Sequence, residues 1–220
     1  MNRPGALTPT SFAILGLLAL RDWTTYELAQ QMELALGRFW PRTRSKLYEE
    51  PKKLVALGLA RAAAESVGGR RRTRYAITPK GRRVLATWVP ARGAGPQLEF
   101  ESLIKVFFAE HGTKSDLLAT LQRARDWARE QAEESVTIPE DYMAGLGSFS
   151  ERLPMLILTG KLLHEFQRTI DDWAAWAIDM VNGWPENLSE AEPDWDTLEQ
   201  LAVMARTLRD GGTPRSRAGR

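Results

Sequence analysis

The feature that most constrains this chain is an apolar stripe near its C-terminal end. Steps of three and four positions separate Met155, Leu158, Leu162, Phe166, Ile170, Trp173, Ala177, Val181 and Trp184. This period, held over so many turns, predicts one long helix. In a chain of 220 residues such a helix needs a partner for its apolar face, from its own chain or from a second copy. We expect it to hold a homodimer together through Leu158, Leu162, Phe166, Ile170, Trp173, Ala177 and Val181.

Shorter helices are expected on either side of this stripe. Residues 90–96 (PARGAGP) are typical of a linker. Phe100, Leu103, Ile104, Phe107 and Phe108 then have the spacing of one helix face, and Asp194 to Leu208 predicts a last helix. Capping spacings predict helix starts at residues 113–116 and 148–151, and Pro139 is expected to break the chain between them.

Charge divides the chain into two unlike parts. Residues 1–92 hold 17 Lys and Arg against 6 Asp and Glu, a net charge of +11, whereas residues 93–220 have a net charge of −9. A basic part joined to an acidic part favours a polyanion as the partner of the first. The alternative is that the two parts attract each other. We expect a DNA-binding domain at 1–92, a helical dimerisation and effector domain at 93–210, and a disordered tail at 211–220.

The basic part begins with three predicted helices. Residues 10–20 are apolar on nearly every face, which suits a buried helix capped by Thr10 or Ser11. Thr24 and Glu27 have capping-box spacing before a second helix that stops at Gly37. A third begins near Thr43 and ends at Gly58, with Pro51 expected to kink it.

Residues 59–77 change to the period of a β-hairpin. Two strand-like runs flank Gly68 and Gly69, and Thr78-Pro79 then signals another helix start. Three helices, a basic hairpin and a fourth helix make a winged helix-turn-helix, whose third helix enters the major groove and whose wing follows the DNA backbone. The fold class expected is therefore mainly α with a small β-hairpin.

Other classes of function find little support. The chain has no cysteine and two histidines far apart in sequence, so a thiolate or histidine-rich metal site is not expected, nor any cofactor. The longest apolar run, residues 12–20, is too short to span a bilayer and lacks a signal-peptide cleavage site, so the cytoplasm is the expected setting. The acidic half offers no paired carboxylates, nucleophile with base, or phosphate loop.

Four motifs together resemble the PadR family of bacterial transcriptional regulators. They are SFAILGLLAL (11–20), TYELA (25–29), KLYEEPKKLVALGL (46–59) and RTRYAITPKG (72–81). The resemblance covers residues 10–90. It implies a winged-helix DNA-binding domain, a homodimer built by C-terminal helices, and repression relieved by a small ligand, with Tyr48, basic and hydroxyl residues and the wing in contact with DNA.

We therefore expect a sequence-specific repressor that binds double-stranded DNA at an inverted repeat and is not an enzyme. The predicted DNA-binding residues are Thr25, Tyr26, Arg42, Thr43, Arg44, Ser45, Lys46, Tyr48, Lys52, Arg70, Arg71, Arg72, Arg74 and Tyr75. A small apolar or aromatic effector is expected near Trp88, Trp173 and Trp176, since large aromatic side chains favour such pockets. The alternatives are a winged helix used for protein contacts and an enzyme in the acidic half.

Overall fold

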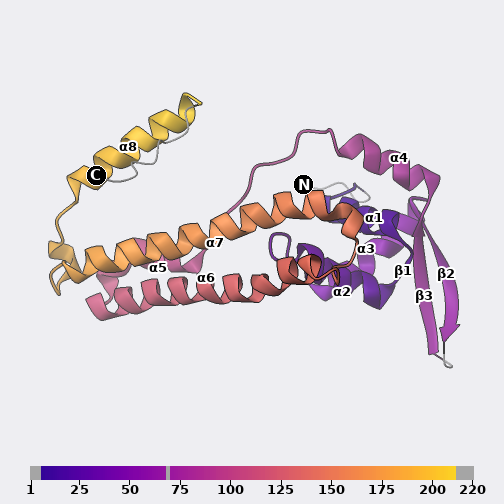
Figure 1. Cartoon of the computed structure of the whole chain (residues 1–220), viewed down its shortest axis with the longest axis horizontal. Coiled ribbons are helices and arrows are strands. Elements are labelled where there is room, and N and C mark those ends of the chain that lie inside the picture. The colour runs from indigo at the N-terminus through magenta and orange to yellow at the C-terminus, as the bar shows by residue number, and fades with distance from the viewer. Residues whose placement is uncertain (1–5, 68–69, 212–220) are drawn as a thin grey trace. The chain divides into compact units, whose positions relative to one another are not determined.

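The computed structural model describes residues 6–67 and 70–211, without the side chains of Val67 and Arg70. It divides into two compact units, residues 1–97 and 98–220. The first contains α1 (Pro9–Leu20), β1 (Trp23–Thr24), α2 (Thr25–Leu36), α3 (Arg44–Ala56), β2 (Ala60–Val67), β3 (Arg70–Ile77) and α4 (Pro79–Trp88). The second contains α5 (Glu101–Phe107), α6 (Lys114–Met143), α7 (Leu153–Asn182) and α8 (Trp195–Arg209), with short 3-10 turns between them (Figure 1). The predicted fold class is confirmed.

Helix α1 is the centre of the N-terminal unit. It packs against α2, α3, α4 and β3, and Ile14, Leu15 and Leu18 are almost fully buried. This agrees with a sequence that is apolar on every face. The cap differs from the prediction: Thr8 caps the helix in a box with Ser11, because Pro9 occupies the first turn and moves the start upstream.

The sheet is small and antiparallel, in the order β1-β3-β2. The predicted hairpin is confirmed by a register that pairs Ala60 with Ile77 and continues to Val67 with Arg70. Gly68 and Gly69, the predicted turn, lie outside the described residues. The capping box of Thr24 and Glu27 at the start of α2 is confirmed too.

Helix α3 corrects one expectation, because it continues through Pro51. The proline ring is almost fully buried, and its packing offsets the missing backbone hydrogen bond. The helix ends before Gly58, whose φ of 69° is the left-handed conformation that favours glycine after a helix. Pro139 likewise lies inside α6 rather than ending it.

The C-terminal unit is built on the antiparallel pair α6 and α7 (Figure 1). Leu117, Leu121, Ala177 and Val181 form its core. Helix α7 confirms the predicted long helix, but only half of its stripe is free. Ile170, Ala177 and Val181 are buried, with the last two in the core shared with α6, whereas Leu158 and Leu162 are 67% and 72% exposed and Phe166 is 39% exposed. The predicted dimer interface is corrected accordingly, because α6 covers the second half of the stripe.

Two details at the helix ends differ from the sequence patterns. The hydroxyl of Ser150 donates to the carbonyl of Gly147, and α7 starts after Arg152 with no side-chain cap, so the expected capping box at residues 148–151 does not form. Helix α8 has the predicted start, capped by Asp194, yet buries none of its residues. Residues 212–220 of the expected tail lie outside the described residues.

Candidate nucleic-acid interface

The first turn of α3 presents hydroxyl and cationic side chains to solvent. Thr43 is the N-cap, and its Oγ1 lies 3.2 Å from Oγ of Ser45 rather than on the helix backbone. Arg44, Ser45 and Lys46 are exposed, while the next residue, Leu47, is buried. The first backbone N–H groups of a helix have no intrahelical acceptor and attract anions. This turn is therefore built to receive a phosphate or a base edge.

Arg44 is already engaged by an acidic neighbour on α2. Its Nε lies 2.9 Å from Oε1 of Glu33 and its Nη2 lies 3.1 Å from Oε2. These two hydrogen bonds lower the pKa of Glu33 and raise the pKa of Arg44. Both side chains are exposed to solvent, Arg44 more than Glu33, so an incoming phosphate can compete for the guanidinium.

A shallow pocket of about 200 Å³ lies between α2 and α3. It brings together three predicted residues: Arg44, Tyr26, which is 63% exposed, and Tyr48, which is half-buried. Gln30 also lines it and is missing from the sequence prediction. It follows Tyr26 by four positions, so helical spacing alone places both on one face.

Three further predicted residues lie on α2, on α3 and in the segment before α3. Thr25 is half-buried as the first residue of α2, and Lys52 is exposed on α3. The guanidinium of Arg42 stacks 4.1 Å from the ring centre of Trp40, and its Nε donates to Oγ1 of Thr10 over 3.3 Å. Arg42 thus braces the segment before α3 as well as contributing charge.

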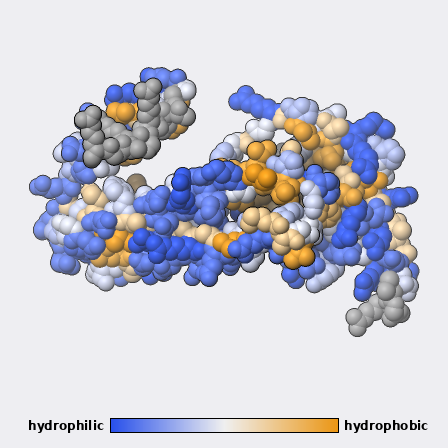
Figure 2. Space-filling model, in the orientation of Figure 1, coloured by the Kyte–Doolittle hydropathy of each residue, from blue (hydrophilic) through white to orange (hydrophobic). Residues whose placement is uncertain are grey.

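The hairpin divides the predicted wing residues into two groups. Arg71 and Arg72 are exposed, and the hairpin end of this unit is mainly hydrophilic in Figure 2. The side chain of Arg70 lies outside the described part of the structure. Arg74 is instead half-buried and ion-paired: it lies 3.0 Å from a carboxylate oxygen of Glu65 and 3.9 Å from one of Glu27.

Tyr75 requires a correction. It is only 4% exposed, since β3 is the central strand and Tyr75 is paired with Trp23 on one side and Ala62 on the other. A buried phenol ring cannot reach a DNA groove, so its role is in the core. Its neighbour Ala76 is also buried, at 6% exposed, so both faces of the strand are covered at this point.

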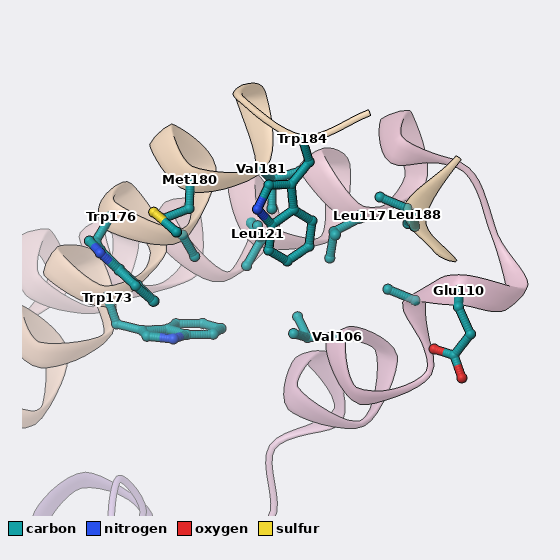
Figure 3. Close-up of a pocket in the computed structure, with 12 residues that line it drawn as sticks. Val106, Glu110, Leu117, Leu121, Trp173, Trp176, Met180, Val181, Trp184 and Leu188 are labelled. Carbon is teal, nitrogen blue, oxygen red and sulfur yellow. The ribbon is translucent and has the colours of Figure 1, made fainter. Parts of the chain in front are cut away.

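The tryptophans predicted to bind an effector do not share one site. Trp173 and Trp176 line an apolar cavity of about 310 Å³ within the C-terminal unit (Figure 3). Trp88 does not line it, because its ring is stacked on Phe12 in the N-terminal unit, with ring centres 4.7 Å apart. Trp184, which the prediction left out, lines the cavity instead.

Other kinds of site find no geometry in the described residues. Within residues 6–67 and 70–211, no cluster of three or more His, Cys, Asp or Glu side chains could hold a metal ion. Among the same residues, no helix is both long and apolar enough to cross a membrane.

Comparison with known proteins matches each unit to a family model. Residues 14–87 match the transcriptional regulator PadR-like family, and residues 101–182 match the virulence activator alpha C-terminal family. A curated relative, the negative transcriptional regulator PadR of Bacillus subtilis (strain 168), is 28% identical over 99 residues, which are 44% of this chain. The matched stretch spans only about half of that relative's length, 54%.

Solved structures show the same fold over most of the chain. The crystal structure of Bacillus subtilis PadR in complex with operator DNA has a TM-score of 0.70 and 22% identity, and covers 79% of this chain and 99% of that one. Bacillus subtilis PadR in complex with p-coumaric acid has a TM-score of 0.63 and 20% identity, and covers 78% and 98%. At these identities the likeness shows a shared fold.

Proposed function

We propose that the chain is a dimeric, sequence-specific DNA-binding repressor, because residues 14–87 match the model of the transcriptional regulator PadR-like family. The observation that carries the proposal is a set of unpaired cations on a winged-helix core. Within the described residues, Lys46 and Lys52 on α3 and Arg71 and Arg72 on β3 are exposed and form no ion pair. Exposed cations at the recognition helix and on the wing are what a duplex backbone requires.

The likeness to a PadR structure solved with operator DNA supports the same partner. Arg44, Ser45, Lys46 and Tyr48 face the major groove, with Tyr26 and Gln30 beside them. Arg71 and Arg72 contact phosphates, while Arg74 holds the hairpin in place through Glu65.

Dimerisation follows from the free half of the α7 stripe. Leu158 and Leu162 are both more than 60% exposed, a state that costs free energy unless another surface covers them. A two-fold dimer places two recognition helices on half-sites about 34–36 Å apart, one turn of DNA. The operator is therefore an inverted repeat.

The regulator acts by binding, catalyses no reaction, and works in the cytoplasm where the DNA is. A small effector releases it from the operator, a role supported by the likeness to PadR bound to p-coumaric acid. Such a ligand shifts DNA binding only if it prefers one state of the dimer, and couplings of about 1–3 kcal/mol are common.

The decisive experiment is selection of genomic fragments by the purified full chain, followed by footprinting of the enriched site. We expect an inverted repeat bound far more tightly than random duplex of equal length. The proposal fails if no fragment is enriched, or if binding to random duplex has no salt dependence.

A further inference from the structure

The cavity of the C-terminal unit is walled by aromatic and aliphatic side chains from α5, α6, α7 and the short segments next to them. Figure 3 shows Trp173 and Trp176 of α7 on one side, Trp184 opposite them, and Val106 of α5 below. Met180 and Leu121 complete the apolar wall. All of these residues belong to one unit of one chain, so the cavity exists in the protomer without a contribution from elsewhere.

The size of the cavity favours a small molecule over a protein segment. Its volume of about 310 Å³ is at the lower end of the range for ligand sites. One turn of a helix with its side chains occupies a cylinder about 10 Å wide and 5.4 Å long, about 420 Å³. The cavity is thus smaller than one helical turn, and its size favours a molecule of about two fused rings.

Hydrogen-bonding groups at the wall are donors. None of the indole N–H groups of Trp173, Trp176 and Trp184 has an acceptor within residues 6–67 and 70–211. In Figure 3 the nitrogen of Trp184 lies on the side of its ring toward Trp176. A ligand that presents an oxygen acceptor can therefore gain a hydrogen bond besides apolar contact.

No charge faces the cavity from its wall. Glu110 is the one charged residue that lines it among the described residues, and its carboxylate points away from the indoles in Figure 3, 3.7 Å from Nε2 of His111. A charged ligand would lose hydration in this cavity without gaining a partner.

The ammonium group of Lys114, close to the cavity, is bound to the backbone of the cavity wall. Its Nζ donates to the backbone carbonyls of Asn182 over 3.0 Å and Trp184 over 2.7 Å, at the end of α7 where a positive charge is favourable. Its side chain is only 13% exposed. Lys114 therefore fixes the backbone that carries Trp184 and leaves the cavity preformed.

We propose that this cavity is the effector site and that it takes an uncharged, planar aromatic molecule of about two fused rings bearing an oxygen acceptor. The assignment rests on the proposed function, since it gives the repressor's ligand a place and a chemical class. It locates the site within one C-terminal unit, so each protomer of the dimer binds one molecule.

Isothermal titration of the full chain with three matched probes tests the ligand class. The probes are 2-naphthol, 2-naphthoate and 2-(aminomethyl)naphthalene, which share one ring system and are neutral, anionic and cationic near pH 7. We expect one 2-naphthol per protomer, bound at least tenfold tighter than either charged probe. Equal or tighter binding of a charged probe overturns the assigned class, and no binding of any probe overturns the site.

Variants of the same chain test the location. Val106→Trp fills the cavity, and Trp176→Leu removes one aromatic ring from its wall. Each substitution should weaken the binding of 2-naphthol at least tenfold. The matched control is Trp195→Leu, since Trp195 is 69% exposed on α8 and does not line the cavity. It should change the affinity less than twofold. Unchanged binding in Val106→Trp, or an equal loss in the control, overturns the location.

A separate readout keeps this inference distinct from the proposed function. Binding of the unliganded chain to operator and to random duplex depends on the N-terminal unit and is measured without any probe. Normal DNA binding together with failed 2-naphthol binding overturns only the effector site. Failed DNA binding in a protein that binds 2-naphthol overturns the proposed function and leaves the cavity as a ligand site.

Discussion

Replacing Glu33 by glutamine should strengthen binding to duplex DNA at low salt and steepen its salt dependence. In the free protein the carboxylate holds the guanidinium of Arg44 through two hydrogen bonds, of 2.9 and 3.1 Å. The pKa of Glu33 lies below its usual value because Arg44 donates these bonds, so the carboxylate is charged at neutral pH. It therefore competes directly with a phosphate for Arg44.

The size of the effect follows from one additional phosphate contact. Each phosphate neutralised adds about 0.9 to the slope of log affinity against log salt. A fourfold rise in salt, from 50 to 200 mM, should then weaken Glu33→Gln by about 3.5-fold more than the wild type. The amide is close in shape to the carboxylate, so the pocket beside Tyr26 and Tyr48 keeps its form.

Fluorescence anisotropy with a labelled random duplex at five or more salt concentrations measures this slope. Glu49→Gln is the matched control, because Glu49 is exposed on α3 and forms no ion pair within the described residues. It removes the same formal charge without releasing Arg44. If the slope of Glu33→Gln equals that of the wild type, or if the control changes it equally, Arg44 does not reach a phosphate.

Three other predictions address the wing and the start of α2. Arg72→Ala should lower the salt slope of DNA binding by about 0.9 without changing stability. Arg74→Ala should lower the melting temperature, because it breaks the ion pair with Glu65. Equal effects of the two variants on both the salt slope and the melting temperature would contradict these separate roles. Thr24→Ala should cost about 1 kcal/mol of unfolding free energy in urea, since Oγ1 of Thr24 accepts the N–H of Glu27 over 3.3 Å; no loss would show that the cap contributes nothing. The backbone N–H of Thr24 donates to the carboxylate of Glu27 and lowers its pKa below the usual value of 4.5. The charged carboxylate should therefore stabilise the fold fully above pH 4.5, and this stabilisation should be lost as the pH falls further. In urea titrations from pH 7 to 3, the free energy of unfolding should decline less steeply for Glu27→Gln than for the wild type.

Most elements of the fold could be predicted from local rules. A capping box at Thr24 and Glu27, a glycine at the end of α3 and Thr78-Pro79 before α4 each act within a few residues, so sequence spacing was sufficient. The long period of α7 is local in the same sense. Where a local rule failed, packing from a distant segment opposed it, as burial does at Pro51.

The candidate site was predicted less completely, because exposure and pairing depend on distant residues. Arg72 and Arg74 are alike in the sequence, yet Arg72 is exposed and Arg74 is ion-paired with Glu65. The sequence predicts Tyr75 as a DNA-binding residue of the wing, but β1 and β2 flank its strand and the side chain is buried. Gln30 had a detectable signal in its spacing from Tyr26, but its place in the pocket needed α3 beside it.

The sequence by itself determined which segments are helices and strands, that one half is basic, and that α7 needs a partner for its apolar stripe. Only the tertiary structure decided how that stripe is used: α6 buries Ala177 and Val181, Leu158 stays exposed, and Trp173 and Trp176 line a cavity. The physical reason is that periodicity identifies the side of a helix that must be covered. What covers it depends on the shape of residues many turns away, which no local pattern encodes.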